Sequence, residues 1–181
     1  MFKKVCIIGC GLIGSSIARA IRKQNLSTKI VSSNRSDSVN KKVIELKIVD
    51  DSNSDTKKMA EGSDLIIIAT PLSSYEDVIL KIKDSLKNGS ILTDVGSVKE
   101  NVISLIEKNV PKNVSWISSH PIAGTEESGP EAGFSELFEN RWCILTPSKK
   151  ANDKDIKLLE TFWKKMGSKV DIMDAKQHDY I

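Results

Sequence analysis

The amino-acid sequence predicts an α/β protein built on a doubly wound, mostly parallel sheet. Short apolar segments alternate along the chain with segments of helical period, which is the pattern of parallel strands joined by crossover helices. Residues 65–68 are apolar at four consecutive positions, as expected of a strand that helices cover on both faces. A glycine-rich turn at 9–14 follows the first apolar segment and opens the first helical one.

The first half of the chain contains five predicted strands. Each is short, rich in apolar or β-branched residues and bounded by turn residues, such as Asn88-Gly89. We place these strands at 3–9, 29–33, 48–49, 64–69 and 90–94. Helices are expected between them at 12–21, at 38–46, in a segment ending near Gly62, and at 75–86.

The second half continues this alternation. Ser97 and Glu100 form a capping-box pattern that would begin a helix running to about Asn109. Further strands are expected at 114–119, 141–146 and 169–173, with a short helix from Pro130 through Phe138 and a longer one at 156–166 that stops at Gly167. Residues 1–173 therefore form one domain, and the polar segment 174–181 begins another helix.

Composition and charge exclude several classes of protein. With 27 basic and 24 acidic residues, the net charge of +3 is spread without a basic stripe, so we expect no nucleic-acid partner. No apolar run approaches the roughly 18 to 20 residues of a membrane span, and residues 5–8 are too short for a signal-peptide core. We expect a cytoplasmic protein without a membrane partner. The three cysteines lack metal-ligand spacing and suggest neither a metal site nor a disulfide framework.

The turn at 9–14 is the first candidate binding site. Gly9, Gly11 and Gly14 match the pattern G-x-G-x-x-G, whose glycines allow a tight turn, close approach of a pyrophosphate and close packing of helix on strand. Leu12 and Ile13 open the helix whose N-terminal N–H groups would face the phosphates. The pattern alone also fits a turn that binds nothing. Its position between a strand and a helix favours a Rossmann-type dinucleotide-binding domain.

The residues after the second strand indicate which dinucleotide is bound. An NAD-binding domain places an Asp or Glu there for the ribose 2′-hydroxyl, whereas this chain has Ser33, Asn34, Arg35 and Ser36. A guanidinium among neutral donors can hold a 2′-phosphate, so NADP is favoured over NAD. In the alternative interpretation, Arg35 is a solvated loop cation, and Asp37 or Asp51 binds the ribose.

Three later strand ends carry residues at the carboxyl edge of the sheet, where open α/β sheets bind ligands. Thr70-Pro71-Leu72 would shape a loop over the ribose and nicotinamide, although an ordinary strand-ending turn has the same composition. Asp94 and Gly96 follow the next strand and are assigned to the cofactor, and His120 follows the strand after that. All of these residues should face one crevice.

Four segments together resemble the prephenate dehydrogenase family, including its arogenate and cyclohexadienyl dehydrogenase relatives. They are the G-x-G-L-I-G turn, D-x-G-S-V-K at 94–99, H-P-I-A-G-T-E at 120–126 followed by Ser128-Gly129, and Gln177-His178-Asp179. They occur in order over nearly the whole chain, and the H-P-I-A-G-T-E segment is much more specific than the glycine turn. The resemblance implies oxidative decarboxylation of prephenate or arogenate in tyrosine biosynthesis, with hydride transfer to NADP or NAD.

The resemblance also implies two catalytic residues. His120 matches the base that accepts the hydroxyl proton of the substrate, and Ser97 would hydrogen-bond the same hydroxyl. From the residues alone, His120 could equally be a buried, hydrogen-bonded histidine, and Ser97 could be a helix cap. Lys99 is interpreted as one half of a surface ion pair and receives no role.

The substrate side of the site is assigned by the same resemblance to Thr125, Glu126 and His178. Glu126 could equally be a solvated carboxylate. Arg141 and Trp142 are interpreted as packing and surface residues.

Residues 174–181 would begin a truncated helical domain that completes the substrate pocket and forms a homodimer, so the chain alone should bind dinucleotide and turn over slowly. The nearest alternatives are NADP-linked enzymes of the β-hydroxyacid dehydrogenase or pyrroline carboxylate reductase type. Those enzymes do not require His120 within H-P-I-A-G-T-E. A non-catalytic dinucleotide sensor is the alternative from another class.

Overall fold

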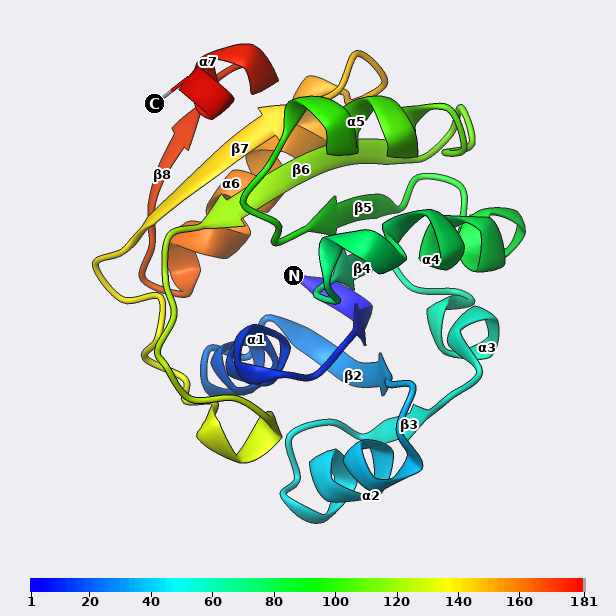
Figure 1. Ribbon diagram of the computed structural model, residues 1–181, viewed down its shortest axis with the longest axis vertical. Helices are drawn as coiled ribbons and strands as arrows, with labels where there is room; N and C mark the ends of the chain where they lie inside the picture. The colour runs from blue at the N-terminus through cyan, green and yellow to red at the C-terminus, as the bar shows by residue number, and fades with distance from the viewer. Residues whose placement is uncertain (181) are drawn as a thin grey trace.

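Figure 1 shows a computed structural model of the chain, which describes residues 1–180. The strands are β1 (Phe2–Ile8), β2 (Ser27–Ser33), β3 (Asp51–Asn53), β4 (Leu65–Ile68), β5 (Ile91–Asp94), β6 (Ser115–Pro121), β7 (Trp142–Pro147) and β8 (Lys169–Ile172). They form one sheet in the order β3-β2-β1-β4-β5-β6-β7-β8. Neighbouring strands pair in parallel, apart from β6 and β7, which are antiparallel. The predicted doubly wound, mostly parallel sheet is confirmed.

Helices connect these strands. They are α1 (Leu12–Lys23), α2 (Asp37–Glu45), α3 (Thr56–Ala60), α4 (Tyr75–Ile82), α5 (Glu100–Glu107), α6 (Asp153–Lys165) and α7 (Ala175–Tyr180), with 3-10 turns η1 (Leu72–Ser74), η2 (Lys83–Ser85) and η3 (Pro130–Ala132). Within residues 1–180, none of these helices has the length and apolar character needed to cross a membrane.

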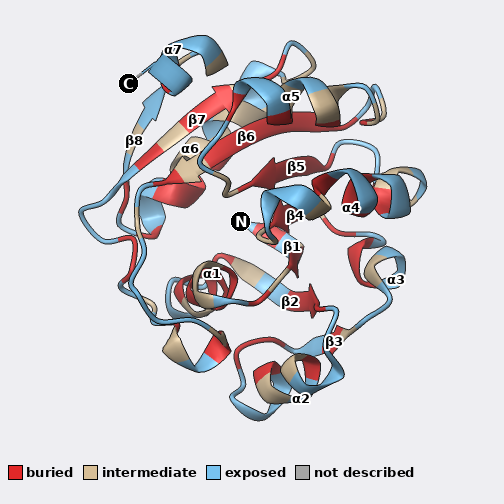
Figure 2. Cartoon of the chain, in the orientation of Figure 1, coloured by how far each residue is buried: buried red, intermediate tan, exposed pale blue. Residues whose placement is uncertain are grey.

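Two apolar cores lie on opposite faces of the sheet, and the sequence of β4 explains why. Leu65 and Ile67 pack into the core that α1, α2 and α6 cover, whereas Ile66 and Ile68 pack into the core beneath α3, α4 and α5. Because successive side chains of a strand point to opposite faces, a strand covered on both sides needs apolar residues at every position. Figure 2 shows the result as central strands coloured almost wholly as buried.

The third strand lies later in the chain than the sequence predicted. Residues 48–49 are not a strand; both are buried after α2, where the amide of Ile48 donates to the carbonyl of Val43. The strand is instead β3, in which Ser52 pairs with Ser32 of β2, and their hydroxyl oxygens are 2.7 Å apart. The apolar residues 48–49 pack into the core, whereas the edge strand β3 consists of polar residues.

The predicted helix from Pro130 through Phe138 is also wrong in length. Only η3 forms, and it ends at Gly133, whose position against α1 leaves no room for a side chain. A Cβ at Gly133 would lie 2.2 Å from the hydroxyl oxygen of Ser15. Leu137 and Phe138 are buried from a turn rather than from a helix.

The strand order places a topological switch point at β1, which pairs with β2 on one side and β4 on the other. Ligands of open α/β sheets bind outside the carboxyl ends of the strands at such a point. The segments after β1, β2, β4 and β5 and the end of β6 all lie at this edge, because these five strands run parallel.

Candidate active site

The three glycines of the turn at 9–14 have different surroundings. Gly9 has a φ of +96° and approaches β4 so closely that a Cβ would lie 2.8 Å from the carbonyl oxygen of Ala69. A Cβ on Gly14 would lie 2.0 Å from the carbonyl oxygen of Gly9, so Gly14 brings α1 against the turn. By contrast, no atom lies within 4 Å of the position where Gly11 would carry a Cβ. The space beside Gly11 is therefore open to a ligand.

The N-terminus of α1 presents unpaired amides at this open space. Gly11 is the N-cap residue and has no side-chain bond to the helix, and the first turn contains no acidic residue. The first N–H groups of a helix lack intrahelical partners and carry a partial positive charge, so they bind phosphates. The residues present fit the pyrophosphate of a dinucleotide.

Asn34 hydrogen-bonds the backbone of the glycine turn. The predicted contact of its side chain with the cofactor is therefore corrected. Its side-chain oxygen accepts a 2.6 Å hydrogen bond from the amide of Cys10, and its side-chain nitrogen donates to Ser32, Asn40 and Ser52. The residue is buried, so the amide has no group left for a 2′-phosphate. An asparagine at a predicted binding position is here a structural residue.

The other three residues of the predicted 2′-phosphate site differ in exposure. Ser33 is buried, and its hydroxyl lies 3.0 Å from that of Thr56 at the start of α3. Ser36 and Arg35 are exposed, and Ser36 pairs with the hydroxyl of Ser38 at 2.7 Å. Arg35 forms no ion pair with any residue among 1–180. Arg35 is thus the cation available at the end of β2.

The alternative ribose ligands lie close by. Asp37 is exposed in the first turn of α2. Asp51 is exposed in β3 and accepts a bond from the amide of Ser52.

The segment Thr70-Pro71-Leu72 follows β4 and begins η1. The hydroxyl of Thr70 accepts a 2.8 Å hydrogen bond from that of Ser74, which also donates to the carbonyl of Pro71. Leu72 is 44% exposed at this edge. The segment is therefore a tight turn with an apolar side chain exposed at its tip.

Asp94 and Lys99 form a buried ion pair at the end of β5. The ammonium of Lys99 lies 3.0 Å from Oδ2 of Asp94, and neither side chain is exposed. The sequence interpretation of Lys99 as part of a surface pair is wrong, because the loop turns its side chain into the sheet. Burial lowers the pKa of Lys99, while the neighbouring Asp94 carboxylate opposes that shift.

This pair joins β5 to β6. Lys99 donates to the hydroxyl of Ser118 and, at 2.7 Å, to the carbonyl of Ser119, and the Asp94 carboxylate accepts bonds from the same two residues. It also accepts from the hydroxyl of Tyr75, and burial together with the Asp94 charge raises the pKa of Tyr75. The Asp94 carboxylate therefore has protein partners on all sides, so its predicted contact with the cofactor is not one its side chain can make.

Gly96 lies beside this pair. Its amide donates a 2.9 Å bond to Asp94, and a Cβ at Gly96 would lie 3.0 Å from both Asp94 Oδ2 and the Tyr75 hydroxyl oxygen. A side chain at this position would crowd both groups.

Ser97 is exposed and does not cap a helix, so the capping-box prediction is wrong. Helix α5 begins two residues later than predicted, with Lys99 as its N-cap residue and no side-chain cap of its own. Within residues 1–180, the Ser97 hydroxyl makes no hydrogen bond to protein, which leaves it available to a ligand. The cap comes instead from Asp179, whose carboxylate accepts bonds from the amides of Lys99 at 2.9 Å and Glu100 at 2.8 Å.

His120 lies at the end of β6 and opens on a cavity of about 390 Å³. The cavity is lined by residues 120–124 and by Arg141, which immediately precedes β7. Burial lowers the pKa of His120 to about 4, and the nearby charge of Lys99 acts in the same direction. His120 is therefore neutral near pH 7, with a lone pair available on one ring nitrogen. The sequence interpretation of Arg141 as a packing or surface residue overlooked this position, because only the antiparallel pairing of β7 with β6 brings Arg141 to the same cavity.

His178 was predicted to contact substrate, but in the structure its ring bonds to His120 and Asp179. Nδ1 of His120 is 2.9 Å from Nε2 of His178, and Nδ1 of His178 is 2.8 Å from Oδ1 of Asp179. His178 is buried, and both of its ring nitrogens have protein partners. The polar segment at the end of the chain thus folds back as α7 against α5 and β7 (Figure 1), where His178 reaches His120 of β6.

The loop after β6 carries the other predicted substrate residues. Thr125 and Glu126 are exposed, and the Thr125 hydroxyl accepts a bond from the amide of Glu127. Neither lines the cavity beside His120. Their substrate contacts remain predictions.

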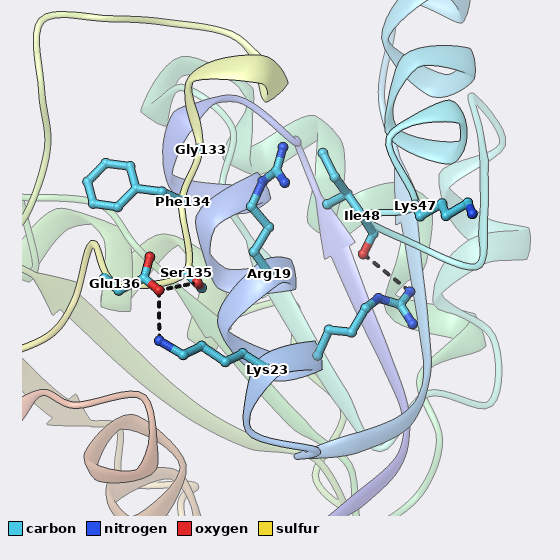
Figure 3. Close-up of a pocket in the computed structure, with 9 residues that line it drawn as sticks. Arg19, Lys23, Lys47, Ile48, Gly133, Phe134, Ser135 and Glu136 are labelled. Atoms are coloured by element: carbon cyan, nitrogen blue, oxygen red, sulfur yellow. Dashed lines mark hydrogen bonds and ion pairs between the residues drawn. The ribbon is translucent and has the colours of Figure 1, made fainter.

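A second surface pocket lies away from this edge, between the C-terminal half of α1 and residues 133–136 (Figure 3). Two of its four cations have acidic partners: Lys23 lies 2.7 Å from Glu136, and Arg22 lies 3.0 Å from Asp50. The pocket is therefore a charged surface depression that shares no residue with the cavity at His120.

Comparison with known proteins agrees with this geometry. Residues 17–172 match the family described as prephenate dehydrogenase, nucleotide-binding domain. The chain is 34% identical to cyclohexadienyl dehydrogenase of Zymomonas mobilis, covering 100% of this chain and 61% of that protein. It is 35% identical to prephenate dehydrogenase of Lactococcus lactis, covering 99% of this chain and 49% of that protein. The chain thus spans about half to three fifths of the length of these relatives.

Solved structures give the same result. Prephenate dehydrogenase from Aquifex aeolicus, in complex with hydroxyphenyl propionate and NAD+, matches with a TM-score of 0.92 at 30% identity, over 99% of this chain and 63% of that chain. Synechocystis arogenate dehydrogenase matches with a TM-score of 0.87 at 26% identity, over 97% and 61% of the two chains. Pyrroline carboxylate reductase from Plasmodium falciparum, at 19% identity and a TM-score of 0.73 over 98% and 60%, shares the fold alone.

The family match covers most of the chain, and the chain aligns over nearly its whole length with the relatives named above. On these grounds the chain belongs to the prephenate dehydrogenase family and comprises that family's nucleotide-binding domain.

Proposed function

We propose that this chain binds a nicotinamide dinucleotide at the carboxyl edge of its sheet and supplies the base for oxidative decarboxylation of prephenate or arogenate. The observation that supports this most directly is the position of His120. It lies near the end of β6, opens on a cavity and is at the same sheet edge as the open space beside Gly11.

The proposed reaction needs few groups from the protein. The substrate carbon that bears the ring hydroxyl loses hydride, the hydroxyl loses its proton, and the ring carboxylate leaves as carbon dioxide while its bonding electrons complete the aromatic ring. A bound nicotinamide supplies the hydride acceptor. His120 accepts the proton, Ser97 hydrogen-bonds the same hydroxyl, and the sheet edge orients the two reactants.

Arg35 is the residue we propose for cofactor choice, with NADP preferred over NAD. It is the exposed cation after β2, whereas Asn34 is occupied beneath the glycine turn. In Arg35→Ala, the KM for NADP should rise at least about tenfold with little change for NAD, because a charge-assisted bond to the 2′-phosphate is lost. Lys41→Ala, an exposed cation of α2, is the matched control. A wild-type preference for NAD would remove this role from Arg35.

The wider assignments are proposals of the same kind. We propose that a helical region beginning near residue 174 completes the substrate pocket and forms a homodimer, which analytical ultracentrifugation of the intact protein would test. Thr125 and Glu126 are proposed to contact substrate from the loop after β6. A cytoplasmic location is supported by Cys6, Cys10 and Cys143, which are buried and unpaired.

The experiment that tests the function supplies the intact protein with prephenate or arogenate and with NADP or NAD, and follows the absorbance of the reduced nicotinamide. Reduction that depends on one of the two substrates supports the proposal and identifies that substrate. His120→Asn should lower turnover at least about 100-fold and leave dinucleotide affinity unchanged. Dinucleotide binding without reduction by either substrate would instead indicate a sensor.

A further inference from the structure

We propose that Asp179 and His178 form a hydrogen-bonded relay that holds His120 in the tautomer whose Nε2 is free to accept a proton. The inference rests on the proposed role of His120 as the base. Both relay residues come from α7, a segment to which the sequence assigned only a substrate contact. His178 and Asp179 are positioning residues, because they act through His120.

The direction of the relay follows from what each group can donate. The carboxylate of Asp179 only accepts hydrogen bonds, so its 2.8 Å partner, Nδ1 of His178, carries a proton. With its single proton on Nδ1, the His178 ring has an unprotonated Nε2, which accepts a hydrogen bond over 2.9 Å from Nδ1 of His120. His120 therefore carries its proton on Nδ1 and presents a lone pair on Nε2.

Asp179 is held in its ionised form by its position. Partial burial raises the pKa of its carboxyl group, but bonds from the amide of Glu100, the ring of His178 and the amide of Lys99 outweigh burial and hold the pKa below its usual range. The two amides belong to the N-terminus of α5, where a negative charge is favoured. The carboxylate thus has two tasks, to cap α5 and to orient His178.

The surroundings of His120 make such a relay useful. The charged and titratable groups that face it are Asp94 of β5, Lys99 at the start of α5, Cys143 of β7, and His178 and Asp179 of α7. Burial and the Lys99 charge both disfavour a protonated His120. When Nε2 takes the hydroxyl proton, His120 becomes positively charged. Its Nδ1 is already hydrogen-bonded through His178 to the carboxylate of Asp179, whose negative charge partly balances the new positive charge.

The first test reads the tautomers directly. The chain contains two histidines, and both belong to the relay. Imidazole nitrogen NMR of the histidine-labelled chain should show Nδ1 protonated and Nε2 unprotonated in both rings near neutral pH. A wild-type His120 protonated on Nε2 and bare on Nδ1 would overturn the proposal without reference to any variant or to activity.

The second test reverses the relay. In Asp179→Asn the new side chain can still accept from the α5 amides, but its NH₂ group faces Nδ1 of His178 and forces the opposite tautomer on both rings. His120 then presents a protonated Nε2 and cannot act as a base. We expect kcat to fall by about 10²- to 10⁴-fold, as when a catalytic histidine is left in the wrong tautomer, while KM and dinucleotide affinity stay within about twofold.

A matched control separates this effect from a general change of charge. Asp171→Asn makes the same chemical change on the exposed strand β8 and should alter neither tautomers nor kcat. Reversed tautomers in Asp179→Asn with an unchanged kcat would show that the relay exists and does not serve catalysis. Full turnover in His120→Asn would contradict the proposed base itself, whatever the tautomers.

Discussion

The ammonium of Lys99 lies 3.0 Å from the carboxylate of Asp94, and both side chains are completely buried between β5, β6 and α5. Each charge compensates the other in a place that water does not reach. Removing one partner of such a pair leaves the other charge uncompensated, which costs more than the pair itself contributes.

Lys99→Met should therefore lower the free energy of unfolding by about 3 to 5 kcal/mol, measured by urea denaturation. Lys87→Met is the control, because Lys87 pairs with Asp64 at 2.6 Å on the surface and its loss should cost less than about 1 kcal/mol. Equal effects of the two substitutions would contradict the importance of burial.

The glycines of the turn should separate stability from binding. Gly14→Ala places a methyl group where the backbone of Gly9 already lies, so it should destabilise the fold strongly. Gly11→Ala meets no atom within 4 Å and has an ordinary φ of −76°, so the free energy of unfolding should stay within about 0.5 kcal/mol of wild type. Its methyl group occupies the space proposed for the pyrophosphate, and the dinucleotide Kd should rise at least about tenfold in a fluorescence titration. Unchanged affinity in Gly11→Ala would place the phosphates elsewhere.

Asn34→Asp tests whether an acid can be introduced after β2 to favour NAD. The substitution replaces an amide that donates to Ser32, Asn40 and Ser52 with a carboxylate that cannot donate. We expect a loss of about 1 to 3 kcal/mol in stability from the unsatisfied buried acceptors, without a switch to NAD. Thermal denaturation and the ratio of KM values for the two cofactors measure both effects. A stable variant that prefers NAD would show that residue 34 faces the ribose.

The low pKa of His120 makes both activity and stability depend on pH. Only the neutral ring accepts a proton, so kcat/KM should decline as pH falls toward about 4, not near the ordinary histidine value of 6.5. In the unfolded chain the ring binds a proton below pH 6.5, whereas the folded protein excludes it until about pH 4. His120 therefore does not lower the free energy of unfolding above about pH 6.5, and it lowers this free energy progressively as the pH falls from 6.5 to about 4.

His120→Asn provides the control for this pH dependence. The slope of unfolding free energy against pH between about 4 and 6.5 should be smaller in the variant than in wild type, because the histidine contribution is gone. Identical slopes would show that other groups account for the acid sensitivity. Urea denaturation at a series of pH values measures it.

The architecture could be predicted from the amino-acid sequence, because the pattern that encodes it is local. The four apolar residues of β4 predict a strand covered on both faces, and alternate members pack into the two cores. The spacing of Gly9, Gly11 and Gly14 predicts a strand, a turn and a helix, which the structure confirms in β1 and α1. Period and backbone geometry depend on near neighbours, so they can be predicted from a single chain.

Which polar residues reach the site depends on the folded arrangement of segments that are far apart in the chain. The expected cap of α5 was Ser97, three positions from Glu100, yet the cap is Asp179, which is 80 positions from Lys99. Lys99 was expected at the surface but is buried, because Asp94, Ser118 and Ser119 accept its hydrogen bonds there. Hydrogen bonds and ion pairs act over a few ångströms in space and have no period along the chain. The contact between His178 and His120 therefore exists only once α7 lies against the sheet.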